Sequence, residues 1–304
     1  MFSKIKSIPY HDINGLLESI QPLEEVTIET SVGPLIPIYF VEDHGRKKLS
    51  PVKFNSDGKI KSINLQKATV VKTSVGDIST ELITFYPSGS IRRIFPLNGK
   101  LSGYWSENDE YKLSPTIEIP TSLGVISAKP IYIHFYETGE LKSITFWPKE
   151  RIFLSTHIGE IDVKTGISFY KSGKIRSIEP ANPVSINTPI GRIKAFDPDP
   201  IGVNGESNSL SFYEDGNIEK ISTISSSIIA ETDSETLILN PQEVPSHCND
   251  EEFMIQPLKI EFGPLEYKFK YNFKVIATTP RNANYKISRF KSTKKIFCAT
   301  SATC

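Results

Sequence analysis

The stretch Phe-Tyr-Pro-Ser-Gly-Ser-Ile-Arg-Arg-Ile, residues 85–94, is one of five similar ten-residue segments in this chain. The other four begin at Phe54, Phe135, Phe169 and Phe212. All five have Phe in the first place, Gly in the fifth, and Ile or Leu in the seventh and tenth. A segment that returns in this way marks one structural unit used several times.

The chemistry of the segment predicts a β-hairpin. Four residues that end in glycine, with Pro87 in the second place of its copy, suit a type I turn followed by a residue with positive φ. That combination is the three-residue hairpin connection with a bulge. After the glycine, apolar and polar positions are spaced as in a strand that has one wet face.

A second glycine turn, Thr-x-x-Gly, precedes each segment, and the same turn chemistry predicts a reversal there. The unit is therefore expected to be a meander of two or three antiparallel strands. A parallel β-solenoid is the alternative, less favoured because the turn signals suit tight reversals. The second turns occupy residues 30–33, 73–76, 121–124, 156–159 and 188–191.

Composition supports an all-β fold class. With 21 prolines and 18 glycines, long helices are not expected. One short N-terminal helix is predicted over Asp12–Ile20, with Asp12 as its cap. The predicted architecture is an antiparallel array of hairpin repeats in an open or rolled sheet. Its expected parts are an N-terminal segment 1–24, five repeats 25–229, an irregular β cap 230–280 and a basic, flexible tail 281–304.

At the positions Phe-Tyr-x-x-Gly-x-Ile/Leu-x-x-Ile the chain resembles the MORN-repeat variant family of bacterial, antitoxin-like repeats. The resemblance covers about ten residues in each copy. The Thr-x-x-Gly turn and the longer period depart from that family, and Ser, Thr or Asp stands where the family has Asn before its glycine. The resemblance implies an open sheet of antiparallel hairpins that serves as an interaction surface, and it implies no catalysis.

Charge and cysteine content indicate a cytoplasmic protein. Lys plus Arg and Asp plus Glu number 35 each, so the whole chain favours neither nucleic acid nor a membrane. No apolar run suits a secretion signal or a membrane helix. The 3 cysteines do not make a disulfide framework, so we expect a reducing compartment and no cofactor.

Three insertions interrupt the repeat. The two glycines of the first and fifth units, Gly33 with Gly58 and Gly191 with Gly216, are further apart than those of the middle units. The extra residues lie at 39–48 and 196–205, and a third insertion spans 96–114. Such loops either cap a sheet edge, which we favour, or bind a ligand. The binding interpretation selects His44, Arg46, Tyr104, Trp105, Asp197 and Asp199.

Metal and catalytic chemistry find little support in the sequence. Asp197 and Asp199 lack the rest of a calcium loop, and the neighbouring pair His247–Cys248 lacks the paired spacing of a zinc site. No catalytic or nucleotide-binding fingerprint is present.

After Glu266 the chain carries no acidic residue. This segment is either a solvated terminus, which we favour, or a surface for an anionic partner. Its basic residues near the end are Lys286, Arg289, Lys291, Lys294 and Lys295.

Two functions follow from these observations. The first is a non-enzymatic repeat protein that acts as a protein-interaction or scaffold module. The alternative is a protein that binds a small molecule or carbohydrate, or an enzyme, and uses the inserted loops.

Overall fold

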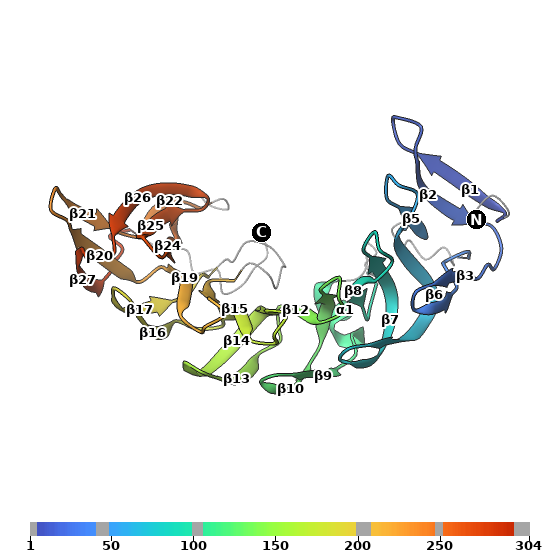
Figure 1. Ribbon diagram of the computed structural model, residues 1–304, viewed down its shortest axis with the longest axis horizontal. Coiled ribbons are helices and arrows are strands. Elements are labelled where there is room, and N and C mark those ends of the chain that lie inside the picture. Colours follow the sequence, from blue (N-terminus) through green and yellow to red (C-terminus); the bar gives the residue numbers. More distant parts are fainter. Residues whose placement is uncertain (1–4, 41–48, 99–105, 199–207, 247–251, 295–304) are drawn as a thin grey trace. The chain divides into compact units, whose positions relative to one another are not determined.

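A computed structural model describes residues 5–40, 49–98, 106–198, 208–246 and 252–294. Nearly all of its regular structure is antiparallel β, and many strands that follow one another in the chain pair as hairpins, as the sequence predicts (Figure 1). The chain forms two compact units. Unit 1 comprises Met1–Glu150 with Phe169–Lys174, and unit 2 comprises Arg151–Ser168 with Ile175–Cys304.

Unit 1 contains one main sheet, in which strands pair in sequence order apart from two separate hairpins. The separate hairpins are β3 (Ile28–Thr30) with β4 (Gly33–Leu35), and β9 (Ile117–Thr121) with β10 (Gly124–Ala128). The strands of the main sheet, in spatial order, are β1 (Ser7–His11), β2 (Leu17–Pro22), β5 (Val52–Phe54), β6 (Ile60–Thr73), β7 (Gly76–Phe85), β8 (Ile91–Phe95), β11 (Pro130–Phe135) and β12 (Leu141–Phe146).

Unit 2 has the same plan, with one main sheet and smaller sheets beside it. The main strands, in spatial order, are β14 (Gly159–Phe169), β15 (Ile175–Pro180), β18 (Leu210–Phe212), β19 (Ile218–Thr223), β24 (Leu258–Phe262), β25 (Glu266–Tyr271) and β26 (Lys274–Pro280). The others are β13 (Ile152–Thr156) on β14, the pair β16 (Val184–Thr188) and β17 (Gly191–Ala195), the pair β22 (Gln242–Pro245) and β23 (Phe253–Gln256), and β20 (Ser226–Glu231) between β21 (Thr236–Leu239) and β27 (Asn284–Arg289).

The Phe-Tyr-x-x-Gly turns have the predicted hairpin geometry. In the copy at 85–94, the Gly89 N–H donates to the carbonyl of Tyr86 at 2.8 Å, and the Tyr86 N–H donates to that of Ser90 at 2.9 Å. The strand register shifts between Thr84 and Phe85, and Gly89 has a φ of 91°. The Phe of every copy is buried, and so is the Ile in the tenth place, so the repeated positions supply the core.

The Thr-x-x-Gly turns are a different kind of reversal. Thr121 pairs directly with Gly124, without a bulge. The Thr121 Oγ1 accepts a hydrogen bond from the Leu123 N–H at 3.1 Å and donates one to the Gly124 carbonyl at 2.7 Å. The same two bonds close the other four turns of this kind. The hydroxyl of threonine therefore closes these turns, a role that the sequence pattern did not reveal.

Side chains of the turns also join one hairpin to a later one. The Tyr136 hydroxyl donates to the Phe169 carbonyl at 2.9 Å, and the Ser122 hydroxyl donates to that of Gly173 at 2.5 Å. In unit 2, His157 occupies the place of that serine, and its Nε2 lies 3.0 Å from the Gly216 carbonyl. His157 thus makes the contact that serine makes elsewhere, and the marker residues of the repeat act as scaffold.

The predicted N-terminal helix over Asp12–Ile20 is wrong. Asp12 stands in the turn between β1 and β2, where its Oδ1 accepts hydrogen bonds from the N–H groups of Asn14 and Leu16. An aspartate can close a turn in this way as well as cap a helix. Gly15 has a φ of 78°, which a helix does not allow, and the side chain of Ile13 is fully exposed.

Candidate functional site

Unit 2 contains a buried carboxyl group at the end of β15. In β15, Ser177 and Glu179 point to one face of the sheet, because side chains two apart share a face. Ser177 is opposite Ser211 of β18, which places Glu179 beside Ser209. The two oxygens of Glu179 accept hydrogen bonds from Ser209, one from its N–H at 2.7 Å and one from its hydroxyl at 2.5 Å. Glu179 itself is 0% exposed.

The surroundings of Glu179 favour its neutral form. Burial raises its pKa to about 7, against an ordinary value of 4.5. The two hydrogen bonds from Ser209 lower the pKa, the charge of Asp197 raises it, and the charge of Lys164 lowers it. Loss of hydration is the largest of these effects. A carboxyl group that is half ionised near neutral pH, and that lies against a cavity, marks a candidate site.

Glu179 lies at the wall of a cavity of about 330 Å³. The strands place a polar row along it, because Ser222 is opposite Lys259, and Lys259 is opposite Lys270. Ser209 bonds to Glu179 and lies next to Ser222, whereas Lys259 and Lys270 follow on the next strands across the sheet. The lining residues are Glu179, Asp197, Asn208, Ser209, Ser211, Lys220, Ile221, Ser222, Lys259, Ile260, Glu261, Lys270, Asn272 and Phe273.

The lysines of the cavity differ in their partners. The Lys270 Nζ lies 2.6 Å from one oxygen of Glu261, and the Lys220 Nζ lies 3.8 Å from the other. Lys259 forms no ion pair with any residue that the structure describes. This part of the cavity therefore combines three cations with one carboxylate.

Asp197 is the candidate from the sequence that the structure brings to this cavity. It is 4% exposed, and its backbone carbonyl accepts a hydrogen bond from the Lys164 Nζ at 3.1 Å. Lys164 also lies over the Phe196 ring, with the Nζ 4.9 Å from the ring centroid. The other candidates in the inserted loops fall outside the described residues; they are His44, Arg46, Tyr104, Trp105 and Asp199.

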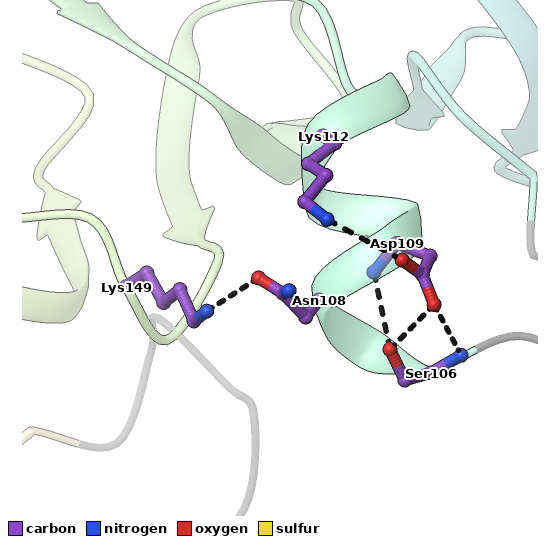
Figure 2. Close-up of polar contacts among 5 residues, drawn as sticks. All are labelled: Ser106, Asn108, Asp109, Lys112 and Lys149. Atoms are coloured by element: carbon purple, nitrogen blue, oxygen red, sulfur yellow. Dashed lines mark hydrogen bonds and ion pairs between the residues drawn. The ribbon is translucent and has the colours of Figure 1, made fainter.

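The C-terminal part of the insertion 96–114 forms a helix, α1 (Glu107–Leu113), in unit 1. Figure 2 shows its capping box, in which Ser106 and Asp109 exchange hydrogen bonds, and the contact of Lys149 with Asn108. The Tyr111 hydroxyl donates to Glu150 at 2.7 Å, and the Lys129 Nζ donates to the Tyr111 carbonyl at 2.9 Å. These contacts attach α1 to the link between β10 and β11 and to the turn after β12, so this part of the insertion is structural.

The structure describes four of the five basic residues that the sequence singles out near the end of the chain. Lys286 and Arg289 belong to β27, which pairs with β20, and the Lys286 Nζ lies 2.5 Å from Glu231. The Lys294 Nζ lies 3.9 Å from the centroid of the Phe253 ring. Lys291 is exposed, and Lys295 lies outside the described residues.

Glu179 is not among the residues singled out from the sequence, although a signal was present. Glu179 follows the tenth residue of its segment, a place that holds Asn64, Phe95, Thr145 and Ser222 in the other copies. A carboxylate where other copies have neutral residues indicates a special environment. The pattern does not show whether that place is exposed, and burial is what shifts the pKa.

Comparisons with known proteins leave the site to be interpreted from its geometry. No protein-family model, curated protein or solved structure matches the chain. Among the described residues, no helix has the length and apolar character needed to cross a membrane. Within the same part of the chain, no three His, Cys, Asp or Glu side chains are grouped so as to hold a metal ion.

Proposed function

We propose that this chain is a non-enzymatic binding scaffold, an array of hairpin repeats akin to the MORN-repeat variant proteins, that holds a protein partner. The residues of the two repeated turns support this function because they close turns and join hairpins, as Thr121, Ser122 and Tyr136 do. A rigid array of this kind presents edges and faces to a partner. The content and placement of its cysteines favour a cytoplasmic setting.

The observation that carries the proposal is the outer strand β26. In the described part of unit 2, β26 ends the strand order and pairs with β25 alone. It exposes two neighbouring apolar side chains, Val275 at 44% and Ile276 at 38%, and Phe273 just before it is 85% exposed. Proteins usually protect an outer strand with charges, bulges or covering segments, because its free N–H and C=O groups pair readily with another chain. The pairing of β26 with β25 contains one bulge, but the strand still exposes these apolar side chains.

An extended segment of a partner suits such an edge. Its backbone would pair with β26 as an added strand, and its apolar side chains would cover Val275 and Ile276. Backbone hydrogen bonds and apolar contacts resist salt, whereas a partner held by the basic residues alone would be released by it. Binding that persists at high salt therefore indicates pairing with β26, and binding that is lost at high salt indicates attraction between the basic residues and an anionic partner.

The test is capture of a partner from a native extract by the full-length chain, at low and at high salt. The variant Val275→Lys/Ile276→Lys places charges on the edge. Val125→Lys on β10 is the matched control, since Val125 is 63% exposed and lies in unit 1. We expect one specific partner with the unaltered chain and with the control, retained at high salt, and its loss with the β26 variant. Equal recovery with the β26 variant, or no specific partner, would refute the proposal.

A further inference from the structure

The cavity beside Glu179 has two chemically distinct ends, which the proposed scaffold function does not use. One end presents Glu179, Asp197 and Asn208 together with Ser209 and Ser222. The other presents Lys220, Lys259 and Lys270 around Glu261. Glu261 pairs with Lys220 and Lys270, and Glu219 pairs with Lys220, which leaves the charge of Lys259 without an ion-pair partner among the described residues. A ligand that matches both ends has several hydrogen-bonding groups at one side and a negative charge at the other.

We propose that this cavity binds a monosaccharide that carries one anionic group. Its volume of about 330 Å³ suits a single small ring, since ligand pockets range from roughly 300 to 1,000 Å³. The hydroxyl groups of the sugar lie toward Glu179 and the serines, and the anionic group lies toward Lys259. A carboxylate and a phosphate share the chemistry that the lysines recognise.

Sugar hydroxyls suit the Glu179 end because they both donate and accept hydrogen bonds. Each oxygen of Glu179 accepts one bond from Ser209, and a carboxyl oxygen has capacity for a second. The hydroxyl of Ser222 donates and accepts as well. A ligand hydroxyl can therefore donate to Glu179 and accept from a serine without bringing a charge to the buried end.

The outer part of the cavity suits the rest of the sugar. Phe273 is 85% exposed and lines the cavity, so its ring offers an apolar surface to the C–H face of a pyranose. Lys259 has no ion-pair partner among the described residues, whereas Lys220 and Lys270 share Glu261. Lys259 is therefore the cation that an anionic group on the ligand would engage first.

The test is calorimetric titration of the full-length chain with glucuronate, glucose 6-phosphate and glucose, with glycine as a zwitterionic rival. We expect at least one anionic sugar to bind and glucose to bind more weakly. Lys259→Met should weaken the anionic sugar about tenfold, because a hydrogen bond between charged groups is lost. It should leave the affinity for glucose unchanged. Lys53→Met on β5 is the control for removal of a lysine from a strand.

Two further variants test the hydroxyl end. Glu179→Gln and Ser222→Ala should weaken both the anionic sugars and glucose, and circular dichroism reports whether each variant folds. If Glu179→Gln does not fold, Ser222→Ala and Lys259→Met still decide the result. Three outcomes would overturn the proposal: neither anionic sugar binds at millimolar concentration, glycine binds in their place, or Lys259→Met leaves the affinity for the anionic sugar unchanged. None of these outcomes depends on β26.

Discussion

Glu179 shows how a single side chain departs from what its neighbours in sequence suggest. It stands in a strand whose other residues are ordinary for a sheet, yet it is fully buried and bonded to Ser209. Burial raises its pKa to about 7. Between pH 4.5 and about 7 the folded chain therefore keeps a proton that the unfolded chain has released. The contribution of Glu179 to folding stability is therefore greatest at the acidic end of this range and falls as the pH rises through it.

We predict that Glu179→Gln removes this loss of stability. The unfolding free energy of the variant minus that of the unaltered chain should rise by about 3 kcal/mol from pH 4.5 to a pH above 7, because burial raises the pKa of Glu179 from 4.5 to about 7. Urea unfolding across this range measures the difference. Glu118→Gln, on an exposed position of β9, is the control. A difference between Glu179→Gln and the unaltered chain that stays constant with pH would contradict the prediction.

At the scale of the element, the hairpin is the unit that the residues specify, and the two glycine turns specify it differently. Gly89 supplies the positive φ of a bulged connection, which the sequence pattern predicts. Thr121 closes a direct pairing with its hydroxyl, which the pattern does not reveal. The helix α1 was also missed, although Ser106 and Asp109 have the spacing of a capping box. The N-terminal helix was predicted instead because Asp12 suits a helix cap and a turn equally well.

We predict that Thr121→Val destabilises unit 1 by about 1 kcal/mol, because the turn loses both bonds of the hydroxyl in a partly hydrated place. Thr121→Ser keeps the hydroxyl and should stay close to the unaltered chain. Urea unfolding, followed by a spectroscopic probe of unit 1, measures both. Equal stability of the valine and serine variants would show that the hydroxyl does not matter.

At the scale of the whole molecule, the net charge influences whether copies of the chain repel one another or associate. The formal net charge at pH 7 is zero, and the isoelectric point is about 7.0. A protein without net charge lacks the repulsion that keeps copies apart. The exposed apolar residues of β26 add a surface on which copies could associate.

We predict that solubility is lowest near pH 7 and rises on either side. Precipitation by polyethylene glycol over a pH series measures it. The variant Val275→Lys/Ile276→Lys adds two positive charges, so its minimum should move to higher pH and its solubility at pH 7 should increase. Val125→Lys adds one charge away from β26 and separates the effect of charge from that of the strand edge. A pH-independent solubility would contradict the prediction.

The sequence by itself determined the fold class and the hairpins. Local chemistry is sufficient for these, since a glycine that must take positive φ, and alternating apolar residues such as Ile91, act within a few positions of the chain. Asp197 was also a candidate from the sequence. Only the tertiary structure placed Glu179 beside Ser209 and brought Lys259 to the same cavity, because that grouping depends on strands far apart in sequence. Burial and strand order arise from packing between elements, and no local pattern encodes them.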